Sequence, residues 1–212
     1  LQATYQAMRK SIGQLSIQPD LLLVDGNKAD IHHYKQKNII NGDQKSISIA
    51  AASIIAKVFR DRMMKEFDII FPKYGFSKHK GYGTKQHIEA IIKYKACPIH
   101  RKSFKPVMDN LPNVSYYKRN KLIEKLGEQL VACYLLRKGY KILEVNYQIP
   151  TYGDVGIISS KNNVLIYIDI KTTFIDGEIL SYEIYHDDKK NDKIINMLSQ
   201  YMDNNKLQCK LK

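Results

Sequence analysis

The sequence has few cysteines, no long hydrophobic run and fewer acidic than basic side chains. Its three cysteines (Cys97, Cys133 and Cys209) lie far apart, so neither a disulfide framework nor a CxxC zinc site is predicted, and a reducing cytoplasm is the expected location. No apolar run approaches the roughly 18 residues that a membrane-spanning helix needs, which argues against a membrane protein. There is also no internal repeat, no low-complexity tract and no recognisable signal peptide.

What the chain does have is a strong positive charge. Lysine and arginine number 34 against 21 acidic residues, a formal net charge of +13 at pH 7, and most of the excess lies in the first half. Binding to nucleic acid is the physical expectation, because each neutralised phosphate releases condensed counterions. A lysine-rich, solvated surface is the alternative explanation. With 44% apolar residues, the chain is too apolar to be disordered.

The length of 212 residues allows two small domains, and both are predicted to be of α/β type. A boundary is predicted between Lys105 and Asn113, where two prolines and polar residues follow a basic segment. This division gives two units, residues 1–110 and residues 115–212, each long enough to bury a core of its own.

Hydrophobic periodicity predicts helices and strands in both units. In the first unit, Ile47, Ala51, Ile54 and Val58 form an apolar stripe at helical spacing. Helices are predicted at residues 46–67, at 84–94 with Thr84 as N-cap, over a segment that carries Leu122, Leu126, Leu130 and Cys133 and stops at Gly139, and at 190–202; strands are predicted at 21–24, 140–147, 153–159, 163–170 and, less regularly, 179–185.

Two aspartates of the first unit stand where chain elements end. The apolar run before Asp25 predicts a buried, parallel strand, and Asp43 stands just before the long helix. Carboxylates at such ends can converge on one point, as phosphodiester hydrolysis with two divalent ions about 3.5–4 Å apart requires. The alternative is that both are turn and capping residues, which are common roles for aspartate beside glycine.

The surrounding motifs favour the first interpretation. In chain order they are Leu-Val-Asp-Gly-Asn (23–27), Gly42-Asp43, the run 48–58, Arg60-Asp61, Phe-Pro-Lys-Tyr-Gly-Phe (71–76), His-Lys-Gly-Tyr-Gly-Thr (79–84) and His-Arg-Lys-Ser-Phe-Lys-Pro-Val (100–107). Together they closely resemble the central and C-terminal part of bacterial ribonuclease HII. The resemblance implies an RNase H-like α/β domain that cleaves the RNA strand of RNA–DNA hybrids and single ribonucleotides embedded in duplex DNA, with Mn²⁺ or Mg²⁺ as cofactor.

The resemblance also implies roles for individual residues. Asp25 matches the third catalytic, metal-binding carboxylate of the family and Asp43 the fourth. Tyr82 matches the tyrosine that stacks on the sugar at the RNA–DNA junction, a role that suits a flat ring since a 2′-hydroxyl crowds it; the alternative is a turn tyrosine packed on the core. Candidates for phosphate or supporting contacts are Lys45, Ser53, Lys57, Arg101, Ser103 and Lys105.

The sequence departs from the family pattern in two ways. The first two carboxylates of the family belong to an Asp-Glu-Ala-Gly-Arg-Gly segment that this chain does not contain, although a helix over residues 1–13 matches the one that normally precedes the third aspartate. We therefore expect this chain alone to be inactive, as a truncated form would be. Asn41 also stands where the family usually has lysine, which puts one phosphate contact in doubt.

The second unit resembles another family. The stretches 127–147, 152–158 and 165–171 are similar to the YraN-like endonucleases, whose core resembles restriction-type nucleases. The resemblance covers nearly all of residues 118–205 and implies a small restriction-endonuclease-like α/β domain.

A candidate metal site follows from the strand period in this unit. Asp169 and Lys171 are two residues apart on a strand and share a face, so the carboxylate could hold Mg²⁺ and the lysine could orient water. An exposed ion pair is the alternative. The family has a second acid where this chain has Gly156, and Asp154 is the nearest substitute, so weak or absent nuclease activity is expected here.

Three functions are compatible with the sequence. They are a ribonuclease HII-type endonuclease, a non-catalytic nucleic-acid-binding module, and a weak DNA endonuclease in the second unit. The sequence does not indicate the oligomeric state.

Overall fold

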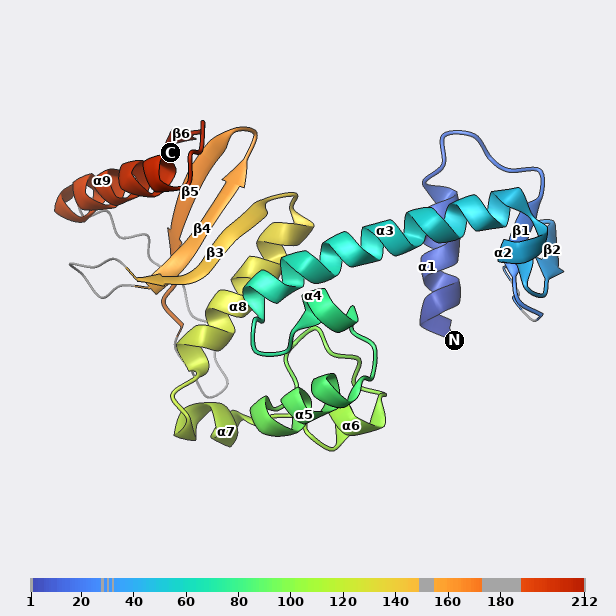
Figure 1. The fold of residues 1–212 in the computed structure, drawn as a ribbon, viewed down its shortest axis with the longest axis horizontal. Helices are drawn as coiled ribbons and strands as arrows, with labels where there is room; N and C mark the ends of the chain where they lie inside the picture. Colours follow the sequence, from blue (N-terminus) through green and yellow to red (C-terminus); the bar gives the residue numbers. More distant parts are fainter. Residues whose placement is uncertain are drawn as a thin grey trace. The chain divides into compact units, whose positions relative to one another are not determined.

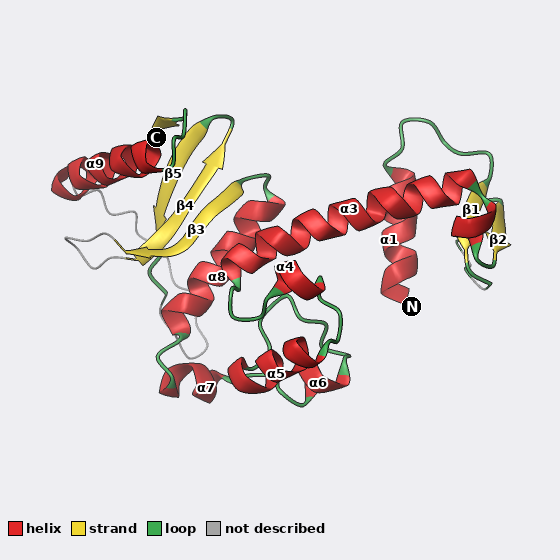
Figure 2. Ribbon diagram, in the orientation of Figure 1, coloured by secondary structure: helices red, strands yellow, loops and turns green. Residues whose placement is uncertain are grey.

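A computed structural model describes residues 2–27, 29, 31, 33–148, 155–172 and 188–211 of the chain. Helices and strands are mixed throughout, which confirms the predicted α/β class (Figure 1, Figure 2). The chain forms two compact units, Leu1–Arg62 and Met63–Lys212. The division predicted near residues 105–113 thus falls within the second compact unit, and the two-domain boundary stays a prediction.

The first unit is built around a small parallel sheet. Strand β1 (Leu22–Asp25) pairs with β2 (Gln36–Ile39), so that Asp25 lies opposite Ile39. The predicted parallel strand ending at Asp25 is confirmed, but among its residues only Val24 is buried. The remaining elements are α1 (Gln2–Gly13), α2 (Gly42–Lys45) and the first part of α3 (Ile47–Ile70).

Helix α3 confirms the helix predicted from the apolar stripe and continues beyond residue 67. The stripe itself is exposed: Ile47 is 90% accessible, Ile54 65% and Val58 44%. Helical spacing predicts an apolar face but not what covers it, and the described part of the chain leaves this face exposed.

The second unit contains a four-stranded sheet with helices. Its elements are the end of α3, α4 (Phe76–His79), α5 (Lys85–Tyr94), α6 (Lys105–Met108), α7 (Val114–Arg119), α8 (Ile123–Arg137), β3 (Lys141–Gln148), β4 (Val155–Lys161), β5 (Val164–Asp169), α9 (Asp188–Asn204) and β6 (Lys210–Leu211). The strand order is β3-β4-β5-β6, antiparallel except for the parallel pair β5-β6. The strand predicted at 179–185 lies outside the described residues. Within those residues, no helix has the length and hydropathy needed to cross a bilayer.

Local signals in the sequence account for the ends of two helices. Thr84 accepts a hydrogen bond from the His87 amide at 3.3 Å and begins α5 as predicted. Helix α8 ends before Gly139, whose φ of 79° is the left-handed conformation that glycine adopts most readily. Among the apolar residues named for this helix, Cys133 is buried but Leu130 is half exposed, and the helix also buries Ala132 and Leu135.

Successive residues of β4 bury their side chains in two different clusters. Ile157 packs in a cluster with Ala132 and Cys133 of α8, whereas Ile158 packs in one with Met197 and Leu198 of α9. This alternation is the two-residue period of a strand, and it places α8 and α9 on opposite faces of the sheet.

The cluster on the α8 side extends well beyond the sheet. It includes Phe71, Tyr74 and Phe76 from the segment that follows α3, as well as Ile91 of α5. The second unit therefore has a core built from residues on both sides of the predicted domain boundary.

A glycine allows α8 to approach the end of β5. A Cβ atom on Gly127 would lie 2.8 Å from Cβ of Thr172 and would also meet its Oγ1. No rotation of the threonine removes the contact with its Cβ, so any side chain at position 127 would push α8 away from the segment that follows β5.

We predict that Gly127→Ala lowers the free energy of unfolding by about 1–3 kcal/mol, the usual cost of overpacking, even though alanine favours helix. Urea unfolding of the whole chain measures the change. Gly13→Ala is the matched control, because the helical Gly13 has no atom within 4 Å of a built Cβ. Equal stability of Gly127→Ala and the unmodified chain would contradict the close approach of α8.

Candidate nucleic-acid interface

A hydrogen bond connects the two segments of the first unit that carry the predicted catalytic aspartates, Asp25 and Asp43. The amide of Gly42 donates a hydrogen bond to Oδ1 of Asp25 at 2.8 Å. Asp43 is the next residue and lies in the first turn of α2. Both aspartates are exposed. The side chain of Asp25, at the end of β1, thus binds Gly42, the residue that precedes Asp43.

The backbone of Asn41 and Gly42 makes this contact possible. Asn41 has a φ of 54°, a left-handed conformation that asparagine tolerates better than most residues. Gly42 is buried, and a Cβ there would lie 3.2 Å from Oδ1 of Asp25 and 2.6 Å from Cδ1 of Ile49. A side chain at position 42 would therefore press on the carboxylate that its amide binds.

The donor chemistry of this pair fits a hard divalent cation, since carboxylate oxygens are the ligands that Mg²⁺ and Mn²⁺ prefer. The described residues contain no group of three histidine, cysteine, aspartate or glutamate side chains placed to hold a metal ion. Asp25 and Asp43 can therefore supply only part of a coordination shell.

The cationic candidates of the first unit have different surroundings. Lys45 donates from Nζ to the carbonyl oxygen of Ile40 at 2.8 Å, so one of its ammonium protons is engaged by the backbone that leads into α2. Ser53 and Lys57 lie on α3 and are exposed.

In the second unit, Tyr82 lies in the loop between α4 and α5. Its ring is 61% accessible, which argues against the alternative of a tyrosine packed on the core. Lys80 and Gly81 both have positive φ, 53° and 78°, and they turn the chain so that the Tyr82 amide donates to the His79 carbonyl at 2.9 Å. A Cβ on Gly83 would lie 3.1 Å from the Phe104 ring, so this glycine also keeps the loop close to the protein surface.

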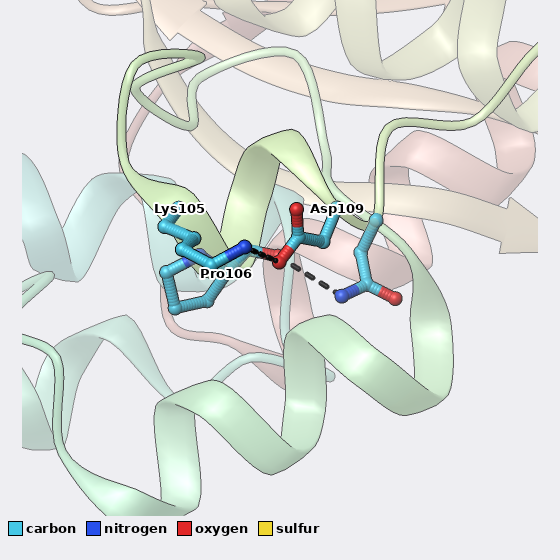
Figure 3. A network of polar contacts seen from close by, with 4 residues as sticks. Lys105, Pro106 and Asp109 are labelled. Atoms are coloured by element: carbon cyan, nitrogen blue, oxygen red, sulfur yellow. Dashed lines mark hydrogen bonds and ion pairs between the residues drawn. The ribbon is translucent and has the colours of Figure 1, made fainter.

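The basic segment after α5 is exposed and partly paired. Arg101 donates from Nε to Oγ of Ser103 at 2.9 Å. Lys105 forms an ion pair with Asp109 at 2.9 Å, and Figure 3 shows the two side chains pointing toward each other. An exposed pair of this kind is worth about 0–1 kcal/mol, so Lys105 can exchange its partner for a phosphate at little cost.

The candidate residues near the end of β5 lie partly within the described chain. Nζ of Lys171 is 3.5 Å from Oδ1 of Asp169, so these two side chains do come together. Asp154 lies outside the described residues. Gly156 offers no ligand and has no room for one, because a Cβ there would lie 2.6 Å from the carbonyl oxygen of Ile168.

Glu128 of α8 is an acidic residue near this pair that the sequence analysis did not single out. It is 3% accessible, and its Oε2 has no hydrogen-bond partner among the described residues. Burial raises the pKa of its carboxyl, and the negative charges of Glu124 and Asp169 act in the same direction against the opposing effect of Lys125. The sequence marks it only as a glutamate beside Gly127, because its burial depends on contacts that the local sequence does not show.

Comparison with known families shows two matches along the chain. The family model described as "Ribonuclease HII" matches residues 1–107, half of the chain. The chain belongs to the ribonuclease HII family. The predicted relationship is confirmed over the stretch that contains Asp25, Asp43 and the Tyr82 loop. Residues 127–211 match the model described as "Uncharacterised protein family UPF0102", the YraN-like family.

Named relatives support the ribonuclease HII assignment. "Ribonuclease HII" of Acetivibrio thermocellus is 57% identical over 104 residues, which cover 49% of this chain and 41% of that protein. The protein of the same name from Endomicrobium trichonymphae is 55% identical over 111 residues, covering 51% and 52%, and that of Clostridioides difficile is 58% identical over 104 residues, covering 49% and 41%. The chain spans about half the length of the curated relatives that it matches.

The buried carboxyl of Glu128 leads to a prediction about pH. Because its pKa is raised in the fold, the folded chain binds this proton more tightly than the unfolded chain, and stability falls as pH rises through the unfolded pKa of about 4.3. We predict that Glu128→Gln is more stable than the unmodified chain at pH 7.5, by about 1 kcal/mol, the cost of a buried unsatisfied group. At pH 4 the difference should nearly vanish.

Urea unfolding at the two pH values measures this effect. Glu124→Gln is the matched control, since Glu124 lies on the same helix but is exposed, and it should change stability little at either pH. A Glu128→Gln variant that is less stable at pH 7.5 would show that the carboxylate is favourably paired.

Proposed function

We propose that this chain carries part of the catalytic machinery of a ribonuclease HII-type endonuclease. Its substrate is the RNA strand of RNA–DNA hybrids and single ribonucleotides embedded in duplex DNA. The observation that carries the proposal is the hydrogen bond from Gly42 to Asp25, because it fixes one carboxylate beside the start of the helical turn that bears Asp43. The family match over residues 1–107 supports it.

Asp25 and Asp43 are the residues that would hold a divalent cation, Mn²⁺ or Mg²⁺. When bound, the cation supplies charge neutralisation at the phosphate and acidifies a bound water. Both aspartates are exposed, so they are open to solvent and to a polyanion.

Tyr82 is proposed to contact the sugar at the junction between RNA and DNA. Its exposed ring can stack on a deoxyribose, and phosphates of the substrate can be bound by cationic and hydroxyl groups that each unit carries. The proposed phosphate-binding residues are Lys45, Ser53, Lys57, Arg101, Ser103 and Lys105.

Residues 1–110 are proposed to be the incomplete ribonuclease HII-like domain and residues 115–212 the YraN-like domain. Since the described residues gather no third metal ligand at Asp25 and Asp43, we propose that this 212-residue chain does not cleave by itself. The free cysteines fit a reducing compartment, and the cytoplasm is the proposed location.

The test uses a duplex DNA with one embedded ribonucleotide and added Mn²⁺. We predict no cleavage by the chain alone and cleavage once it is joined to the N-terminal segment of a relative, with a loss on the order of 100-fold when Asp25→Asn or Asp43→Asn removes a ligand. Asp20→Asn, at another exposed aspartate of the first unit, is the control and should leave cleavage unchanged. Rapid Mn²⁺-dependent cutting by the chain alone would refute the proposed inactivity.

The alternative is a non-catalytic nucleic-acid-binding module, and the same variants distinguish it from the proposed endonuclease. Such a module binds hybrid duplex in a salt-sensitive way that neither Mn²⁺ nor Asp25→Asn changes. The proposed metal site instead requires Mn²⁺ to strengthen binding of the duplex and Asp25→Asn to abolish that increment.

A second candidate function is DNA cleavage through the YraN-like segment. It is favoured by the buried carboxyl of Glu128, whose Oε2 has no hydrogen-bond partner among the described residues and which lies near the pair formed by Asp169 and Lys171. Cleavage of a DNA duplex that survives Lys171→Ala would exclude this site as its origin.

A further inference from the structure

Three histidine rings pack together directly beneath the Tyr82 loop. The rings of His79 and His87 stack with centroids 4.1 Å apart, and those of His87 and His100 with centroids 5.2 Å apart. The ring of Phe76 contacts all three, with centroid distances of 5.4 to 5.8 Å. His79 and His87 are buried and His100 is partly buried.

Two of these rings bind the backbone of the loop. Nδ1 of His79 accepts a hydrogen bond from the Gly81 amide at 3.2 Å. Nδ1 of His87 lies 2.8 Å from the carbonyl oxygen of Tyr82, which also accepts the Thr84 amide at 2.8 Å. The loop is therefore attached to imidazoles at two points, the Gly81 amide just before Tyr82 and the carbonyl oxygen of Tyr82 itself.

These contacts define the tautomer of His79. Its Nε2 lies 2.7 Å from the carbonyl oxygen of Tyr74, which can only accept, so Nε2 carries the proton. Its Nδ1 accepts the Gly81 amide and therefore carries none. His79 is thus a neutral ring protonated on Nε2.

The same reasoning gives His87 the opposite tautomer. The Tyr82 carbonyl can only accept, so Nδ1 of His87 carries the proton and its Nε2 is an acceptor when the ring is neutral. The partner at that Nε2 is Nε2 of His100, 3.0 Å away, which must then donate.

With its proton on Nε2, the Nδ1 of His100 is an acceptor, and its lone pair receives the Cys97 amide at 2.9 Å. The Cys97 sulfur lies 3.0 Å from the same nitrogen, and burial raises the pKa of this thiol to about 12, so it places no negative charge beside the ring. One ordered series therefore runs from Cys97 through His100 and His87 to the Tyr82 carbonyl.

This series of hydrogen bonds can form only while the rings of His87 and His100 are neutral. A second proton on His87 or on His100 would set two donors against each other, either between the two Nε2 atoms or at the Cys97 amide. Burial, followed by the neighbouring His87 ring, lowers the pKa of His100 to about 4, and burial lowers the pKa of His87. The ring of Tyr74 packs against that of His100, with centroids 5.0 Å apart. Its hydroxyl donates to the Lys95 carbonyl at 2.6 Å, and burial raises its pKa, so it stays neutral too.

We propose that His79, His87 and His100 are positioning residues, which as neutral imidazoles of fixed tautomer hold the backbone of residues 80–84 so that the Tyr82 ring is presented at the surface. The contact of that ring with nucleic acid rests on the proposed function. The arrangement of the three rings is independent of the proposed function. Among the described residues the cluster does not form a metal site, so hydrogen bonding is the role that its geometry supports.

The first experiment determines the tautomers directly. In long-range ¹H–¹⁵N spectra of the whole chain at pH 7.5, the two nitrogens of a fixed neutral imidazole have well-separated ¹⁵N shifts. We expect the proton on Nε2 in His79 and His100 but on Nδ1 in His87. A His87 ring protonated on Nε2, or averaged between both forms, overturns the proposal and needs no nucleic acid to do so.

The second experiment separates positioning from packing. In His87→Asn the amide nitrogen can take the place of Nδ1 and donate to the Tyr82 carbonyl, whereas His87→Leu keeps an apolar side chain without a donor. Amide hydrogen exchange of Thr84, which shares that carbonyl, should be about tenfold faster in His87→Leu and close to the unmodified rate in His87→Asn. Equal rates in both variants overturn the proposal.

Binding of a fluorescent duplex with one embedded ribonucleotide then tests the link to function. His87→Leu should weaken binding about tenfold and His87→Asn much less, with His33→Asn as a control that removes an imidazole from the first unit. If the unmodified chain does not bind, the proposed function fails while the tautomer and exchange results still decide the role of the histidines. If it binds and His87→Leu binds equally well, the positioning role fails alone.

A pH series provides a signature that packing would not give. Because the folded pKa values of His87 and His100 are lowered, the protection of Thr84 should be full above the unfolded pKa of about 6.5 and should decline as pH falls from there toward 4. In His87→Asn this decline should be reduced. Protection that is constant between pH 7.5 and 4.5 overturns the proposal.

Discussion

The packing of rings around Phe76 is the constraint on which the second unit depends. Phe76 is 2% accessible and contacts the rings of Phe71, Tyr74 and all three histidines of the cluster. Burial among such rings removes the water that would stabilise a charged imidazole, and it lowers the pKa of His87 and of His100. The hydrogen-bond partners of the rings then fix their tautomers, and two of these hydrogen bonds attach the loop.

In the first unit, the lack of a side chain at Gly42 has a comparable effect, because it allows one functional residue to be held in place. Gly42 binds Asp25 through its amide, and the space that its Cβ would occupy is taken by Asp25 and Ile49. The carboxylate is held from one side by a backbone donor, which leaves its second oxygen for another partner. Asn41, with its left-handed φ of 54°, turns the backbone just before this amide.

The sequence predicted those features whose cause is local. Thr84 begins α5 and Gly139 follows the end of α8, because capping and left-handed turns depend on one or two residues. It did not predict the burial of Glu128 or the role of His87, since both depend on contacts between segments distant in the chain or on the pairing of two rings. The apolar stripe on α3 shows the same limit: its spacing predicts the helix and the apolar face, but it does not indicate whether that face is covered.

The core of the second unit gives a reason why the two family segments occur in one compact body. Phe71, Tyr74 and Phe76 belong to the ribonuclease HII match, whereas Ala132 and Ile157 belong to the UPF0102 match, yet all five lie in a single buried cluster. Removing either segment would expose part of this cluster to water, at about 25 cal/mol for each Å² of apolar surface. The rings that pack against the Tyr82 loop therefore belong to the same core as the sheet that carries Asp169. A substitution in α8 that loosens this core should also loosen the packing of the three histidine rings.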